Sequence, residues 1–155
     1  MFIKLIFLDI DGVLNSHDFW KRCRELGIVP DDKVDPLAVE RLNRLVDATG
    51  AKIVVSSTWR LSYVWSKKLS SLIGRIQKLG ITGEIIGMTP DHCKAYGRGG
   101  EIQAWMDHCN EEIESFVILD DDSDMDHLMG YLVQTKMTDG LQDHHVETAI
   151  QILNK

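Results

Sequence analysis

The sequence of 155 residues contains few cysteines and no long hydrophobic run. Its three cysteines are far apart and form no CxxC pair, which argues against a disulfide framework and a structural zinc site. Cys93 and Cys109 each follow a histidine, but adjacent residues point in different directions and rarely share a metal ion. The opening segment MFIKLIFL is too short to span a bilayer and lacks a signal-cleavage site. We therefore expect a cytoplasmic protein with reduced thiols and no membrane partner.

Basic residues are also in the minority. The chain has 17 lysine and arginine residues against 24 aspartate and glutamate residues, a formal net charge of -7. This balance disfavours indiscriminate binding to nucleic acid or anionic membranes, although it permits a local basic pocket. No repeat, linker or shift in composition divides the sequence, and a hydrophobic content of 44% is typical of a globular protein. We expect a single domain over residues 1–155.

Five short apolar segments alternate with helical patterns. The predicted strands span residues 3–8, 51–56, 84–89, 115–120 and 131–135. Their nearly continuous hydrophobic character is typical of parallel strands that are covered on both faces. Strands that alternate with helices indicate an α/β fold with right-handed crossovers. In open sheets of this kind, ligands bind beyond the carboxyl ends of the strands.

Apolar residues at helical spacing predict the helices. Two stripes end at Gly50 and Gly80, because glycine commonly terminates a helix. The stripes consist of Leu37, Leu42, Leu45 and Val46, and of Val64, Leu69, Leu72, Ile73 and Ile76. A third helix is predicted from Gly99 to about Asn110, with Ile102 and Trp105 or Met106 facing inward, and a fourth carries Val146, Ile150 and Leu153.

Acidic residues stand where two of the predicted strands end. Asp9 ends the first strand, and Asp120 with Asp121 ends the strand over 115–120. Carboxylates gathered at one edge of a sheet repel each other unless a cation lies among them. Magnesium takes carboxylate, carbonyl and water oxygens, so we predict Asp9 and Asp121 as ligands, with the backbone carbonyl of Asp11 as a further oxygen.

Asp9 and Asp11 are two positions apart at a strand end. If the chain is still extended there, both side chains point the same way and face one substrate. A metal-bound carboxylate and a second carboxylate further from the ion have different pKa values, which suits one to be a nucleophile and the other an acid–base group. Gly12 permits the sharp exit that the backbone then needs.

The segment SSTWR, residues 56–60, offers donors for a phosphate. It follows a predicted strand directly and contains the hydroxyl groups of Ser56, Ser57 and Thr58 and the guanidinium of Arg60. Arg98, in GRGGE, stands at the entrance to the third predicted helix, where its charge can stabilise a transferring phosphoryl group.

These segments resemble, in chain order, the four motifs of the haloacid dehalogenase (HAD) superfamily of phosphatases. They are DIDGV at 9–13, the serine that ends the second strand, the basic residue that opens a later helix, and VILDDDSD at 117–124. The resemblance implies a three-layer Rossmann-like core with strand order 3-2-1-4-5. It also implies that Asp9 forms an aspartyl-phosphate, Asp11 protonates the leaving group and then activates water, and Ser56 holds a phosphate oxygen.

The resemblance further implies a magnesium site completed by Asp121 and Asp120. For the third motif, where the family usually has lysine, we prefer Arg98 to Lys94 because of its position against the helix. Residues 15–36 and 59–83 leave room for only a short helix and loop each, so we expect a minimal cap. Uncapped members of this superfamily tend to act on large substrates.

SSTWR together with RGGEIQAWM resembles the phosphatase domains of RNA-repair proteins and, more distantly, the phosphatase half of polynucleotide kinase. A phosphorylated 3′ or 5′ nucleic-acid end is therefore the preferred substrate. Trp59 is expected to stack on a base, and Trp20 to do so from the opposite rim. A mononucleotide or sugar phosphate is the alternative, favoured by the acidic net charge.

Simpler interpretations stand beside these. Asp9 and Asp11 can be a helix cap and a turn residue, the hydroxyls of residues 56–58 can cap a helix, and Arg60 can be a surface cation. Trp59 can belong to the core, as Trp65 and Trp105 are expected to do. Asp122, Asp124 and Asp126 suit a solvated turn, with Asp124 the one that can orient the loop of Asp121.

Two other function classes remain. One is a phospho-aspartate switch modified at Asp9 that does not turn over, although Asp11 then has no purpose. The other is a degenerate family member that binds metal and serves only as a partner surface. His127, His144 and His145 have no role in any of these chemistries.

Overall fold

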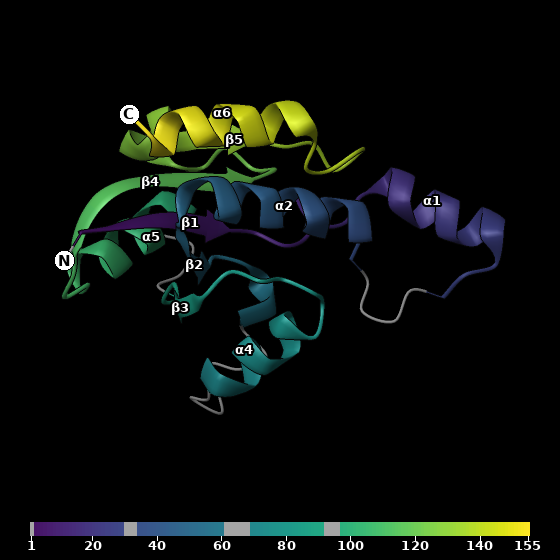
Figure 1. Ribbon diagram of the computed structural model, residues 1–155, viewed down its shortest axis with the longest axis horizontal. Helices are drawn as coiled ribbons and strands as arrows, with labels where there is room; N and C mark the ends of the chain where they lie inside the picture. The colour runs from purple at the N-terminus through teal and green to yellow at the C-terminus, as the bar shows by residue number, and fades with distance from the viewer. Residues whose placement is uncertain (1, 30–33, 61–68, 92–96) are drawn as a thin grey trace.

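The computed structural model describes residues 2–29, 34–60, 69–91 and 97–155, with the backbone alone at Arg60. Figure 1 shows a central sheet with helices on both sides. The strands are β1 (Phe2–Leu8), β2 (Lys52–Val55), β3 (Ile85–Met88), β4 (Glu112–Asp120) and β5 (Leu132–Gln134). They form a parallel sheet in the order β3-β2-β1-β4-β5, so the predicted strand order is confirmed.

The register of the central strands aligns their carboxyl ends. Leu8 of β1 pairs with Val55 of β2 on one side and with Leu119 of β4 on the other. The residues that follow these positions in the three strands, Asp9, Ser56 and Asp120, therefore lie at the same level of the sheet. Two backbone hydrogen bonds extend this register, from the amide of Asp9 to Leu119 (2.9 Å) and from the amide of Ser56 to Leu8 (2.8 Å).

Helices cover both faces of the sheet. The α-helices are α1 (His17–Leu26), α2 (Pro36–Thr49), α4 (Leu69–Gln77), α5 (Gly97–Asp107) and α6 (Asp143–Leu153), and two 3-10 helices are η1 (Thr58–Arg60) and η2 (Asp126–Tyr131). Ile6 and Leu8 of β1 face a core shared with α2, α4 and α6, whereas Leu5 and Phe7 face a second core that includes Ile102 of α5. The protein is a three-layer α/β structure, as predicted.

The predicted helices differ from the structure in detail. The third begins at Gly97 and ends at Asp107, slightly earlier than predicted. Leu37 was expected to face the core but is 47% exposed, because it lies in the first turn of α2, directly after the N-cap Asp35 and Pro36. Gly50 ends α2 with a φ of 68°, the left-handed conformation that glycine adopts readily. Val64 lies outside the described residues.

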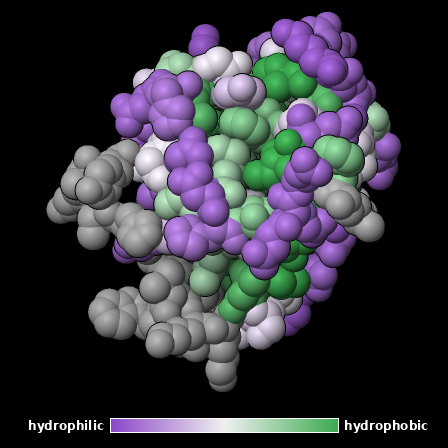
Figure 2. All heavy atoms as spheres, turned by 90° about the vertical axis from the view of Figure 1, so that its left-hand side faces the viewer, coloured by the Kyte–Doolittle hydropathy of each residue, from purple (hydrophilic) through white to green (hydrophobic). Residues whose placement is uncertain are grey.

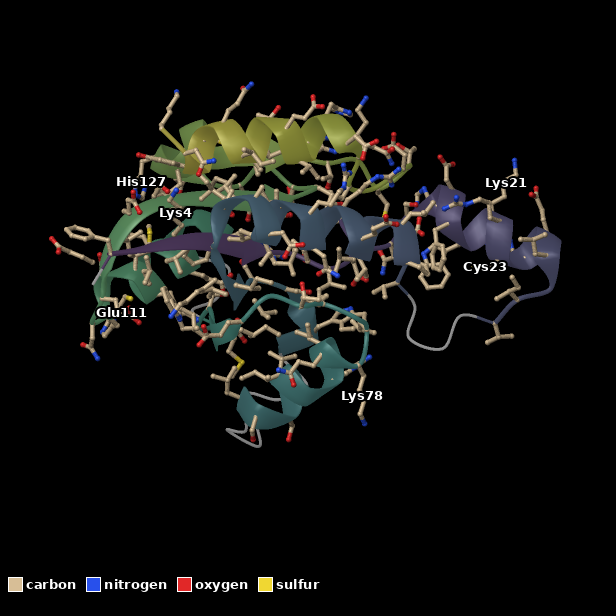
Figure 3. The ribbon with its side chains drawn as sticks, in the orientation of Figure 1. Lys4, Lys21, Cys23, Lys78, Glu111 and His127 are labelled. Atoms are coloured by element: carbon tan, nitrogen blue, oxygen red, sulfur yellow. The ribbon has the colours of Figure 1, made fainter. Side chains whose placement is uncertain are left out.

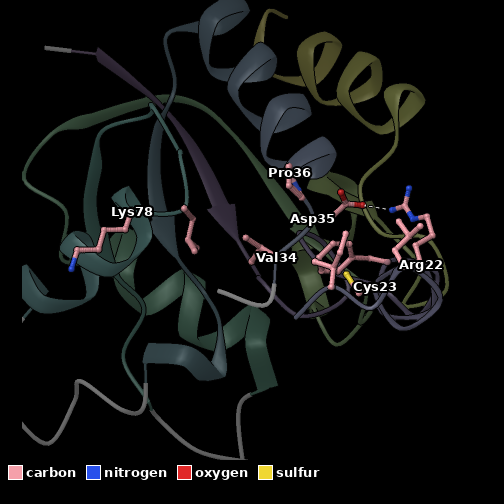
Figure 4. Close-up of a pocket in the computed structure, with 10 residues that line it drawn as sticks. Arg22, Cys23, Val34, Asp35, Pro36 and Lys78 are labelled. Atoms are coloured by element: carbon pink, nitrogen blue, oxygen red, sulfur yellow. Dashed lines mark hydrogen bonds and ion pairs between the residues drawn. The ribbon is translucent and has the colours of Figure 1, made fainter. Parts of the chain in front are cut away.

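The helix α1 lies beyond the carboxyl end of β1 and is the short insert predicted for residues 15–36 (Figure 1). Figure 3 shows Lys21 extending from its outer side, and the side chain of Lys21 is 69% exposed. Cys23 is only 8% exposed and lines a cavity of about 440 Å³ between α1 and the start of α2 (Figure 4). An ion pair of 2.8 Å between Arg22 and Asp35 joins the two segments there.

Figure 2 shows the opposite end of the molecule, where β1 begins. Hydrophilic and hydrophobic atoms are both exposed on this face. Phe2, the first residue of β1, is 66% exposed. None of the described helices combines the length and the apolar character needed to span a membrane.

Candidate active site

Three carboxylates meet at the carboxyl ends of β1 and β4. Asp9 follows β1 directly, and Asp120 is the last residue of β4, with Asp121 after it. One oxygen from each lies within 4.8 Å of the other two. Asp9 is 6% exposed and Asp120 is fully buried. Within the described part of the chain, this is the group of acidic side chains that is arranged to hold a metal ion, and the Asp11 carboxylate does not belong to it.

Arg98, the second residue of α5, supplies a positive charge to this group. Its Nε lies 3.2 Å from Asp120 Oδ2, and its Nη1 lies 3.7 Å from Asp9 Oδ1. Nη1 also donates a hydrogen bond to the backbone carbonyl of Ser56. The guanidinium therefore contacts the ends of three strands, β1, β2 and β4. Lys94, the other candidate for this position, lies outside the described residues.

The start of α5 is held by Asp124. Its Oδ2 accepts a hydrogen bond from the backbone amide of Arg98 (3.1 Å), and its carbonyl accepts one from Gly99 (3.0 Å). Asp124 therefore positions Arg98 and not, as the sequence suggested, the loop of Asp121. That loop is held by Gln134, whose Nε2 donates to the carbonyl of Asp121 (3.1 Å).

Burial dominates the ionisation of the site. Desolvation and the Asp120 carboxylate raise the pKa of Asp9 to about 9, although Arg98 and the Ile10 amide oppose this. Desolvation likewise raises the pKa of Asp120 to about 6, against the attraction of Arg98. Burial alone would lower the pKa of Arg98, but the neighbouring carboxylates raise it. One arginine thus leaves the group with an excess of negative charge.

The chain turns sharply after Asp9. The amides of Val13 and Leu14 both donate to the carbonyl of Ile10, so the chain forms a tight turn from Ile10 onward. Gly12 has a φ of 84°, and a Cβ at this position would lie 2.5 Å from Cγ of Asp121. The glycine is therefore required both for the turn and for the close approach of Asp121.

Two residues that the sequence analysis missed fasten this turn. The side-chain amide of Asn15 donates to Asp11 Oδ1 (2.8 Å) and accepts from the Gly12 amide (3.0 Å). Thr135, which follows β5, donates from Oγ1 to the carbonyl of Gly12 (2.7 Å). Asn15 stands four positions after Asp11, a spacing that brings side chains together in a helical turn, and this was the available signal. No sequence pattern pointed to Thr135.

Ser56 occupies the end of β2 that faces the acidic group. It is 1% exposed, and its Oγ has no hydrogen-bond partner among the described residues. Ser57 is also buried, and its Oγ accepts from the amide of Trp59 (3.2 Å), which fits a cap of η1. Thr58 is exposed. The side chain of Arg60 lies outside the described residues.

The tryptophans have different environments. Trp59 is half-buried against the larger core, and the guanidinium carbon of Arg75 lies 4.3 Å from its ring centroid. Trp20 is half-buried and tilted against Phe19, with 5.4 Å between the ring centroids. Trp105 packs edge-on against Phe7 in the second core, as predicted. Trp65 lies outside the described residues.

A parallel sheet in the order β3-β2-β1-β4-β5, with carboxylates at the ends of β1 and β4, is consistent with a Rossmann-like HAD core. The family described as the HAD domain in Swiss Army Knife RNA repair proteins matches residues 5–146, and the chain belongs to this family. No curated protein and no solved structure matches the chain. Membership suggests phosphatase-type activity.

Proposed function

We propose that this protein is a magnesium-dependent phosphomonoesterase that forms an aspartyl-phosphate on Asp9. The observation that carries the proposal is the convergence of Asp9, Asp120 and Asp121 within 4.8 Å at the carboxyl ends of two strands. A structural role for this group is disfavoured, because buried carboxylates of like charge destabilise a fold unless a ligand or a substrate repays the cost.

The donor set fits a magnesium ion. All three groups are hard oxygen donors, and Asp120 Oδ2 accepts no hydrogen bond from the described N–H and hydroxyl groups, although it is fully buried. Asp9, Asp120 and Asp121 would hold the ion, with the Asp11 carbonyl as the further predicted ligand. When bound, the ion neutralises the carboxylates and polarises a substrate phosphoryl oxygen.

The proposed reaction has two steps. An Asp9 carboxylate oxygen attacks phosphorus in line, the bond between phosphorus and the ester oxygen breaks, and Asp11 donates its proton to the departing oxygen. Asp11 then takes a proton from water as the water oxygen attacks phosphorus. The bond between Asp9 and phosphorus breaks, which releases inorganic phosphate and restores the carboxylate.

Ser56 and Arg98 are proposed to act on the phosphoryl group. The buried Oγ of Ser56 can donate to a phosphoryl oxygen, which would give this hydroxyl the partner it lacks among the described residues. Arg98 already contacts the ends of β1, β2 and β4, and its charge can offset the charge that builds up on the transferring group. Ser57, Thr58, Trp59 and Arg60 remain predicted substrate contacts.

The preferred substrate is a phosphorylated nucleic-acid end. The RNA-repair description of the family supports this choice, as does the single short helix in the insert after β1. The arginine over the ring of Trp59 covers part of its surface, so a base that stacks on this residue would do so beside Arg75. The net charge of -7 favours the second candidate, a mononucleotide or sugar phosphate.

Hydrolysis of p-nitrophenyl phosphate tests the activity. We expect turnover with Mg²⁺, none with EDTA, and a loss of at least about 10³-fold in Asp9→Asn, because the nucleophile is removed. Thermal unfolding must show that Asp9→Asn is folded. If wild type fails to turn over with Mg²⁺, the enzymatic proposal is wrong, and the phospho-aspartate switch and the metal-binding scaffold replace it.

Magnesium binding has its own test with a matched pair of variants. Ligand binding to the native state raises its stability, by about 2.7 kcal/mol when the free ligand exceeds Kd a hundredfold. We expect Mg²⁺ to raise the melting temperature of wild type and of Asp122→Asn, since Asp122 is outside the acidic group. Asp121→Asn should lose most of this shift. An equal shift in both variants would contradict the assigned site.

A substrate panel decides between the two candidates. Oligonucleotides with a 3′ or 5′ phosphate, mononucleotides and sugar phosphates are compared by kcat/KM. We expect the oligonucleotides to be preferred. A hundredfold preference for mononucleotides, which corresponds to about 2.7 kcal/mol, would reject the nucleic-acid end as the substrate.

A further inference from the structure

We infer that Asn15 is the positioning residue of Asp11 and determines which of its two carboxyl oxygens exchanges the proton with the leaving group. The inference rests on the proposed phosphatase function and adds a residue that lies outside the four motifs. It is based on the hydrogen bonds of the buried Asn15 side chain and on the contacts that hold the turn after Asp9 in place.

The side-chain amide of Asn15 bridges Asp11 and Gly12. Its Nδ2 donates to Asp11 Oδ1 at 2.8 Å, and its Oδ1 accepts from the Gly12 amide at 3.0 Å. The opposite orientation of the amide would face oxygen with oxygen and N–H with N–H, so the partners fix it. Asn15 is 3% exposed, which limits competition from water for either bond.

The turn that carries this bridge is fastened from two other directions. The Gly12 carbonyl accepts from Thr135 Oγ1 at 2.7 Å, and the Val13 carbonyl accepts from the Leu141 amide at 2.8 Å. On its remaining side, Gly12 lies against Asp121 so closely that no Cβ would fit. Asn15 therefore acts from a backbone that is held in place, which is what precise orientation of a reacting group requires.

The chemistry of the bond selects the Asp11 oxygen. An N–H that donates to Oδ1 disfavours a proton on that same oxygen, so the acidic proton belongs on Oδ2. In the first step the proton leaves Oδ2 for the ester oxygen, and in the second step Oδ2 receives a proton from water. Because the donor is neutral, the same bond can persist in both protonation states of Asp11.

A purely structural role for Asn15 predicts a different result. If Asn15 only closes the turn, its loss disturbs Asp9 and Asp121 as much as Asp11, and every substrate is affected alike. If Asn15 positions the acid, its loss affects substrates in proportion to their need for a proton. A p-nitrophenolate leaving group departs without one, whereas an alcohol requires it.

The experiment compares Asn15→Ala with wild type on two substrates: p-nitrophenyl phosphate and the alkyl phosphomonoester that wild type hydrolyses fastest. The readout is the ratio of the two kcat/KM values. The folded fraction cancels in this ratio, because it scales both kcat/KM values equally. Each kcat/KM value depends only on the steps up to release of the leaving group. We expect the alkyl value to fall about 10- to 100-fold and the aryl value to fall much less.

Two further variants sharpen the test. Asn43→Ala removes an amide that makes the same kind of bridge far from the site, to Gly80 (2.9 Å) and Thr82 (3.0 Å), and the ratio should stay at the wild-type value. In an Asp11→Asn background, Asn15→Ala should change the ratio little further, because the two residues act as a unit.

The outcomes separate the two proposals. If wild type hydrolyses both substrates and the ratio in Asn15→Ala is unchanged, Asn15 has only a structural role and the inference is overturned while the phosphatase function stands. If wild type hydrolyses neither substrate, the proposed function itself fails, and the role of Asn15 falls with it.

Discussion

Aspartate and arginine meet in two regions of this protein, and the pKa of the acid is raised in one region and lowered in the other. At the active site, one arginine faces Asp9 and Asp120, and burial raises the pKa of both acids. Between α2 and α6, two arginines face Asp143, which is 65% exposed. There, hydrogen bonds from Arg44 and Arg41 lower the pKa of the acid. The same pair of residue types thus stabilises a charge at the surface but leaves one poorly compensated in the interior.

The comparison shows what the interior group is suited to do. An exposed ion pair is solvated by water in addition to its partner, so it needs nothing else. The buried group lacks that solvation and has more acids than bases among the described residues. The proposed magnesium ion would supply the positive charge that this group lacks.

Removal of Arg98 should have the largest effect on stability. In Arg98→Met, the buried carboxylates lose the cation that faces them, and the cost of an unpaired buried charge is about 3–5 kcal/mol. Denaturant unfolding in EDTA measures this loss, and Mg²⁺ should recover part of it. The matched variant Arg44→Met, at the exposed pair, should lose much less. Equal losses in the two variants would remove the contrast between the regions.

Asp9→Asn should act in the opposite direction. It removes an acid whose ionised form is destabilised by burial, so the metal-free protein should gain about 0.5–2 kcal/mol while activity is lost. Because the folded pKa of about 9 exceeds the ordinary value of 3.8, wild-type Asp9 contributes stability at acid pH and loses it as pH rises toward 9. The advantage of the variant should therefore grow with pH. A variant less stable than wild type at pH 8 in EDTA would contradict this account.

His145, two positions after Asp143 on α6, provides a pH test away from the active site. Its Nδ1 accepts from the Gln142 amide (2.9 Å), and burial, together with His144, lowers its pKa below the ordinary 6.5. Its contribution to stability is complete above pH 6.5 and decreases as pH falls, because the unfolded chain binds the proton first. We expect a loss of about 0.5–1.5 kcal/mol, the net worth of one hydrogen bond. In His145→Asn, the midpoint of urea unfolding should therefore depend less on pH between pH 7 and pH 5 than it does in wild type.

The smallest change is expected from Asp143→Asn. This variant breaks an exposed pair that salt screens, so unfolding in high salt should not distinguish it from wild type. The lowered pKa of Asp143 means that its stabilising effect is present above pH 3.8 and is lost as pH falls further. Its low-salt difference from wild type should therefore disappear in strong acid. A difference that persisted there would indicate a contact other than the ion pair.

Much of the scaffold could be predicted because its signals are local. Apolar runs indicated the strands, and the ends of these runs located Asp9, Ser56 and Asp120. The rule that parallel strands present their carboxyl ends on one edge then brought these residues together. The strand order came from the family resemblance and is confirmed. The inward face of the last helix, with Val146 and Leu153 buried, also followed from spacing alone.

The contacts within the site could not be predicted in the same way. Asp124 and Arg98 are 26 positions apart, and Gly12 and Thr135 are 123 positions apart. Such pairs depend on how turns and helix ends pack, which no local pattern encodes.

The sequence by itself determined where each strand stops and which polar residue comes next, since both depend on the order of apolar and polar side chains along the chain. Only the tertiary structure decided that one arginine contacts the ends of three strands, and that an asparagine holds the second aspartate. The physical reason is that hydrogen bonds and ion pairs act over a few ångströms, so their partners are chosen by the packing that brings distant segments together.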